Sequence, residues 1–292
     1  MARVPSLLPH LAATVSAQRT VIEQVLARAD RLDDPSVLHD LRVALRRAAA
    51  VAKLTRGFPD AGSGEPLRVA ARNLRRSLSP SRTLEVAAGL LGTRFRRDPR
   101  RRKPAETLAA LIVPREKARR PRRRAGDRGL AAVRKAFSLR DAELARLARP
   151  FFFAPVSAAN ETLAKVVRGR LRKKKKRLLF SGLPDETSLH AARIAAKDLR
   201  YSLEFVRHLV PGVPELLPAF QRFQDAAGDA HDRIELIAIV ERVGRRRSPA
   251  LRRAARTILP VLRADAARTL RRARTSARTL FRLLEAFPVE WS

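Results

Sequence analysis

Two histidines, His39 and His190, stand in similar surroundings 151 positions apart in the sequence. Each is followed by an arginine three residues later and by a second base seven residues later. Imidazole gains a proton near neutral pH, and guanidinium presents paired N–H groups to phosphate or carboxylate oxygens. A lone histidine is more often structural, but a repeated set indicates an anion-binding function. The repeated set is His39, Arg42, Arg46, Lys53, His190, Arg193, Lys197 and Tyr201.

These side chains can act together only if one helix face presents them. At 100° per residue, the first set falls within a sector of about 60° and the second forms the same stripe within about 80°, and the leucines of the same segments fall elsewhere. Asp34 followed by Pro35, and Asp185 in the second copy, are typical of helix N-termini five residues before each histidine. We therefore predict two equivalent helices, each with an apolar face and a separate basic face.

A second element follows each basic face, in residues 71–86 and 220–236. Both segments predict a helix, a tight break and another helix, with Arg82 and His231 in nearly corresponding places. Such a break would expose a helix N-terminus, whose backbone N–H groups bind anions. With the basic residues of these segments, of the two repeats and of the basic run at 170–177, the candidate set gains Arg47, Arg72, Arg75, Arg82, Lys173, Arg200 and His231.

Almost every segment has a helical period, and none alternates like a strand between hairpin turns. Two basic stretches stand out: a proline-containing one at 94–128, which suggests a connector between two halves, and a run at 170–177 inside a helical pattern. The fold class predicted is all-α, with bundles of long antiparallel helices. The expected helices span 6–32, 35–57, 65–78, 81–97, 104–119, 128–149, 156–181, 186–210, 214–227, 230–244 and 248–286.

The net charge of +35, from 63 basic and 28 acidic residues, calls for an anionic partner. Nucleic acid, an anionic membrane and polyphosphate all meet that requirement. Cysteine is absent, which excludes disulfides, thiol nucleophiles and cysteine-ligated zinc. Aromatic residues make up 5% of the chain, too few for a protein that stacks bases. No apolar run approaches the roughly 20 residues of a membrane span, and no signal sequence is evident, so we expect a cytoplasmic protein without a membrane partner.

The segments LHDLRVALRRAAAV and LHAARIAAKDLRYSLEF resemble the two histidine motifs of CHAD domains, the conserved-histidine α-helical domains. LSPSRTLEV and AAGDAHDRIEL resemble the family's two following elements, although Ala49, Ser79 and Thr83 depart from the usual residues. The resemblance covers essentially the whole chain, 1–292, and implies two helical halves, about 5–125 and 126–289, related by a pseudo-twofold repeat. It further implies a central basic cavity that binds inorganic polyphosphate and an association with polyphosphate granules.

Two other functions stay open from the sequence. A nonspecific nucleic-acid-binding protein would carry the same charge, because both kinds of binding depend on counterion release. A helical metal phosphohydrolase could use His190, His231, Asp232 and Asp265, but basic residues crowd these positions. We expect a monomeric, non-catalytic binding domain with no cofactor and no metal.

Overall fold

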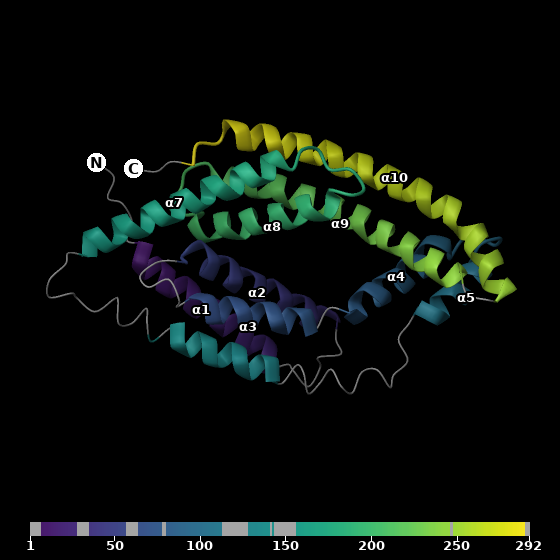
Figure 1. Ribbon diagram of the computed structural model, residues 1–292, viewed down its shortest axis with the longest axis horizontal. Coiled ribbons are helices and arrows are strands. Elements are labelled where there is room, and N and C mark those ends of the chain that lie inside the picture. The colour runs from purple at the N-terminus through teal and green to yellow at the C-terminus, as the bar shows by residue number, and fades with distance from the viewer. Residues whose placement is uncertain are drawn as a thin grey trace.

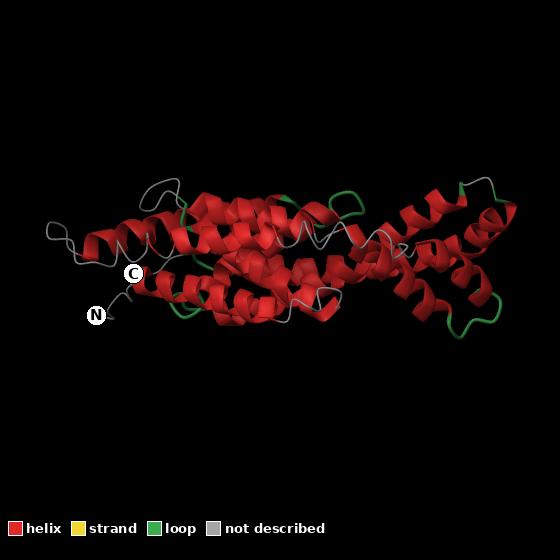
Figure 2. Ribbon diagram, turned by 90° about the horizontal axis from the view of Figure 1, so that it is seen from below, coloured by secondary structure: helices red, strands yellow, loops and turns green. Residues whose placement is uncertain are grey.

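The computed structural model describes residues 7–27, 35–56, 64–77, 80–112, 128–140, 142, 156–245 and 248–289. All regular secondary structure in these ranges is helical, which confirms the predicted fold class (Figure 2). None of the described helices is long and apolar enough to cross a membrane. The helices are α1 (Leu7–Ala27), α2 (Pro35–Leu54), α3 (Gly64–Ser77), α4 (Pro80–Phe95), α5 (Arg102–Ile112), one over 128–140, α7 (Val156–Phe180), α8 (Leu189–Val206), α9 (Val213–Gly244) and α10 (Pro249–Ala286).

The molecule is elongated, and the α9–α10 hairpin runs along most of its length (Figure 1). At one end the hairpin packs with α4 and α5, and at the other it adjoins the remaining helices. A larger apolar core joins α1, α2, α3, the 128–140 helix, α7, α8, and parts of α9 and α10. A smaller core joins α4 and α5 to the remaining parts of α9 and α10. Each core therefore combines helices that lie far apart in the sequence, and the pseudo-twofold relation of the halves stays a prediction.

The predicted break near Gly228 is wrong, because α9 is a continuous helix of 32 residues. A glycine inside a helix costs about 1 kcal/mol relative to alanine. The neighbouring Ala227 and Ala230 are fully buried in the larger core, so packing outweighs that cost. His231 consequently lies within a helix, and no backbone anion site exists at this point. The corresponding first-half break, at residues 78–79, lies outside the described residues.

The start of α8 also differs from the prediction, because the helix begins at Leu189 with Ser188 as its N-cap. Asp185 still performs a capping role for the preceding turn. Its Oδ1 accepts hydrogen bonds from the Ser188 amide at 2.7 Å and from Thr187 Oγ1 at 2.8 Å. The bonds from Ser188 and then Thr187 hold the pKa of the Asp185 carboxyl well below its usual range. The first-half cap, Asp34, lies outside the described residues.

Helices α9 and α10 approach each other closely at Gly244, near the end of α9. A Cβ at this position would lie 2.7 Å from the Cβ of Ala255 on α10. Gly244→Ala should lower the free energy of unfolding by about 1–3 kcal/mol, because the helices must separate. The control, Gly92→Ala on α4, meets nothing within 4 Å and should raise it by up to about 1 kcal/mol. Denaturant unfolding measures both, and equal stability of the two variants would contradict this packing.

Candidate anion-binding site

Two adjoining cavities, of about 610 and 430 Å³, lie between α2 and α8. They share Arg46, His190, Arg193 and Lys197 along their common border, and we name the two together the basic cleft. The remaining lining comes from α2, α3, α4, α7, α8, α9 and the turn before α8. These residues are His39, Arg42, Ala49, Ala50, Lys53, Arg68, Arg72, Val86, Arg177, Glu186, Ile194, Asp198, Tyr201, His231, Asp232, Ile234 and Glu235.

Both repeated histidine sets line this single cleft. Leu41 and Leu45 on α2, and Leu199 and Leu203 on α8, are almost completely buried in the larger core. Because the basic residues occupy a different face of each helix, this packing leaves them along the space between the helices. The predicted residues brought together there are His39, Arg42, Arg46, Lys53, Arg72, His190, Arg193, Lys197, Tyr201 and His231.

Three predicted residues do not line the cleft. Arg47 Nε lies 3.0 Å from Glu204 Oε2, and Arg200 Nε lies 2.9 Å from the other oxygen of the same carboxylate. Arg200 also donates to Gln224 Oε1 at 2.9 Å. These two arginines therefore join α2, α8 and α9. Lys173 is exposed on α7.

Arg75 and Arg82 are also in the candidate set. Their side chains lie outside the described part of the structure.

Two lining arginines, Arg68 and Arg177, were not in the predicted set. Arg68 lies four residues before Arg72 on α3, so helical spacing could have identified it. Its Nε donates to Glu65 Oε2 at 2.7 Å. Arg177 ends the basic run of α7. A local sequence pattern does not show that α7 packs near α2 and α8, so this residue could not be identified from the sequence.

A partly buried carboxylate, Asp198, links three helices at one end of the cleft. Asp198 forms ion pairs of 2.8 Å with Lys53 and with Lys174, which joins α8 to α2 and α7. Burial opposes ionisation of Asp198, but the two ammonium groups outweigh it and keep its pKa below the usual range. Burial lowers the pKa of Lys174 to about 8, against the opposing influence of Asp198. The network thus holds Lys53 in place at the cleft wall.

Positive charge dominates the lining. Eight arginines and lysines face four carboxylates, and three histidines add to the basic side. The Nε of Arg72 is buried and donates to no acceptor among the described residues. A buried donor of this kind costs about 1–3 kcal/mol until an acceptor reaches it. The cleft is therefore suited to an anion with several oxygen atoms.

His190 and His231 lie side by side, with ring centroids 5.0 Å apart. Burial lowers the pKa of His231, and Arg193 and His190 lower it further against Glu235 and Asp232. An anion bound between these rings and Arg193 would favour the protonated form. Anion binding at this place would consequently be coupled to proton uptake.

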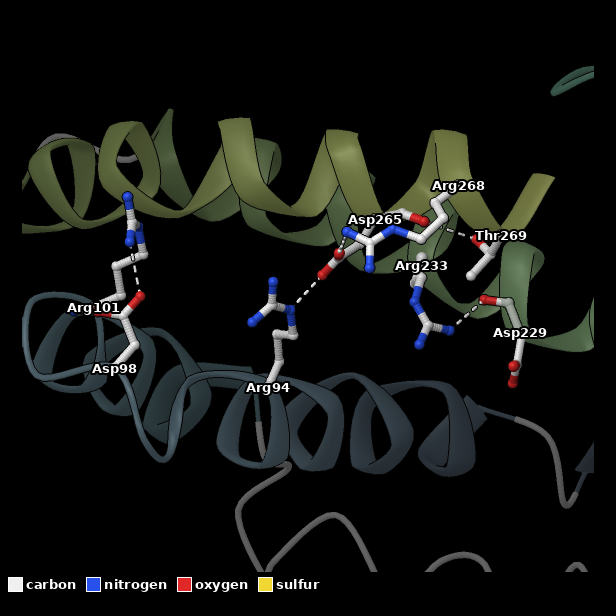
Figure 3. A network of polar contacts seen from close by, with 8 residues as sticks. All are labelled: Arg94, Asp98, Arg101, Asp229, Arg233, Asp265, Arg268 and Thr269. Atoms are coloured by element: carbon white, nitrogen blue, oxygen red, sulfur yellow. Dashed lines mark hydrogen bonds and ion pairs between the residues drawn. The ribbon is translucent and has the colours of Figure 1, made fainter. Parts of the chain in front are cut away.

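Asp265, the last residue of the phosphohydrolase alternative, lies on α10 between two arginines. Arg94 of α4 and Arg268 bind its two carboxylate oxygens, the latter at 3.1 Å (Figure 3). Arg233 donates to the backbone oxygen of Asp229 at 2.8 Å nearby. Within the described ranges, no three histidine, aspartate or glutamate side chains are placed to hold a metal ion. Asp265 therefore serves as a counter-ion between α4 and α10.

A family model, CHAD domain, matches residues 16–241. This range includes both histidine sets, and the chain belongs to the CHAD domain family. The crystal structure of the CHAD domain from the plant Ricinus communis is 21% identical, with a TM-score of 0.64 over 93% of this chain and 91% of that one. PptA from Streptomyces chartreusis is 20% identical, with a TM-score of 0.58 over 96% of this chain and 99% of that one. These two likenesses show the fold. No curated protein matches the chain.

The environment of His231 predicts a measurable titration. In the free protein its pKa should lie below 6.5, and Arg193→Ala should raise it because a nearby positive charge is lost. NMR titration of the ring protons measures both values. Because the unfolded chain binds this proton more tightly, His231 should reduce the free energy of unfolding as pH falls through 6.5. Arg253→Ala, exposed near the start of α10, is the control, and an unchanged pKa in Arg193→Ala would contradict the assignment.

Proposed function

We propose that this protein binds inorganic polyphosphate in the basic cleft, with successive phosphates held between α2 and α8. The observation that carries the proposal is the meeting of two histidine–arginine sets, 151 residues apart in sequence, across one space. A polyphosphate chain offers oxygens along its whole length and can follow such a two-sided wall. Guanidinium groups bind these oxygens through paired, charge-assisted hydrogen bonds.

The shape of the cleft favours a thin polymer over a nucleic-acid duplex. The larger cavity, of about 610 Å³, has the volume of a cube roughly 8.5 Å on a side, whereas a single turn of duplex is about 34 Å long. Tyr201 is the one phenylalanine, tyrosine or tryptophan in the lining, and it is buried. Single-stranded nucleic acid is usually held by stacking on several exposed rings. A polymer without bases needs no such rings.

The proposed role is binding without catalysis, at polyphosphate granules in the cytoplasm. The cleft places eight arginines and lysines around its four carboxylates, and Asp265 is engaged by two arginines rather than facing the cleft. Incubation of the protein with polyphosphate and magnesium should therefore release no phosphate above the blank. Sustained release that is lost in a His190→Ala variant would overturn this part of the proposal.

Arginines on both walls of the cleft should matter most for affinity. Arg42→Ala with Arg193→Ala removes one guanidinium from each of α2 and α8. A charge-assisted contact contributes about 1.5–3 kcal/mol, so polyphosphate affinity should fall on the order of a hundredfold or more. The matched control, Arg96→Ala with Arg97→Ala, removes two exposed charges beyond α4 and should lower affinity only a few-fold. Calorimetry at about 150 mM salt measures both.

Arg42 is largely buried, so its loss could also disturb folding. Arg46→Gln with Lys197→Gln provides a second pair of more exposed cleft residues, and circular dichroism checks the helicity of every variant. If the two cleft double variants and the control double variant bind polyphosphate equally well, the protein is a diffuse polycation and the cleft is not the binding site.

Competition separates polyphosphate from nucleic acid. At about 150 mM salt, long-chain polyphosphate should displace a labelled polyphosphate probe at much lower charge concentration than duplex DNA does. Polyphosphate should also raise the melting temperature, because a ligand of the folded state stabilises it and here relieves repulsion within a chain of charge +35. Equal displacement by the two polymers, charge for charge, would favour the nucleic-acid function.

A further inference from the structure

The outer face of α10 carries a long row of arginines that the cleft does not use. Eight of them fall within a helical sector of about 120°, on the side opposite the buried residues of α10. All eight are exposed, and none lines the basic cleft. We name this row the arginine ridge, and it consists of Arg252, Arg253, Arg256, Arg263, Arg271, Arg274, Arg278 and Arg282.

The composition bias of the chain does not explain this row. Over its 38 residues α10 has ten arginines and two acidic residues, whereas its partner α9 has three arginines and six acidic residues. A general preference for arginine would affect both helices of the hairpin alike. Basic charge is therefore concentrated on α10 specifically.

Few carboxylates of the protein neutralise the charge of the arginine ridge. Arg263 pairs with Glu241 of α9 at 2.8 Å. The other seven ridge arginines have no carboxylate partner in the described part of the chain. One exposed carboxylate, Glu285, stands on the same side of the helix near its end. The ridge thus presents almost uncompensated positive charge to solvent.

The length and shape of the ridge restrict the partner. From Arg252 to Arg282 the helix rises about 45 Å. A duplex lying alongside would turn through more than one full turn of about 34 Å, so its strands would face the ridge over part of that length. The one aromatic residue of α10, Phe281, packs partly buried against the larger core, which leaves no ring for base stacking. A flexible polyanion without bases can follow the whole row.

We propose that the arginine ridge is a second polyphosphate-binding surface, which lets one protein molecule join two chains, or two distant segments of one chain. The proposal rests on the proposed function, because its ligand is the same polymer. Figure 1 shows α10 along one outer edge of the molecule, while α2 lies on the far side of α8 and α9. A chain in the cleft and a chain on the ridge can therefore be bound at the same time.

A two-step capture experiment tests this bridging. Protein is first bound to immobilised long-chain polyphosphate at about 150 mM salt, and soluble labelled long-chain polyphosphate is then added. The wild-type protein should retain the labelled chain. Arg271→Ala with Arg274→Ala and Arg278→Ala should retain about tenfold less, because three solvent-exposed charge contacts are lost. The first capture of this variant should change by no more than about twofold, because the cleft is intact.

The matched control is Arg96→Ala with Arg97→Ala and Arg100→Ala, which removes the same charge from exposed positions around the end of α4. It should retain the labelled chain like the wild type. Equal losses in the ridge and control variants would overturn the proposal, as would full retention by the ridge variant. Uptake of labelled duplex DNA in place of polyphosphate, charge for charge, would reassign the ridge to nucleic acid.

The two steps also separate this inference from the proposed function. If the first capture survives in Arg42→Ala with Arg193→Ala but is lost in the ridge variant, the cleft function fails and the ridge is the principal site. If the cleft variant loses the first capture and the ridge variant loses only the second step, both the proposed function and the ridge inference are supported.

Discussion

The packing of α2 against α8 holds two rows of positive charge face to face. Leu41 and Leu45 of α2 and Leu199 and Leu203 of α8 lie in the same core, and burial of each such side chain contributes about 1.5–3 kcal/mol. That apolar contribution opposes the repulsion between the two rows. Without it the basic residues would separate, and no cleft would exist.

Two carboxylates of α8 relieve the same repulsion at particular points. Glu204 binds Arg47 of α2 together with Arg200 of its own helix, and Asp198 binds Lys53 of α2. Both acids face basic residues on the neighbouring helix, so they fix the distance and register between α2 and α8. The other basic residues of the cleft are thereby held close together.

The sequence predicted the helices and the common site because both depend on local patterns. Helical period identified the elements, and the repeated spacing after His39 and His190 identified the two basic faces. Arg47 and Arg200 were placed in the site because they share those segments, yet both bind Glu204, which lies in a distant segment from Arg47. Gly228 was read as a break because local propensity ignores the buried alanines beside it. Contacts between distant segments decided each of these differences.

The cleft also has lining residues from helices of both apolar cores. His39 and His190 come from helices of the larger core, whereas Val86 belongs to α4, whose neighbouring side chains pack in the smaller one. Side chains of the α9–α10 hairpin pack in both cores, so the hairpin connects them. Under the proposed function, a ligand in the cleft would contact helices of both cores. Its binding would resist bending of the molecule and would slow exchange of amide hydrogens in the central part of α9.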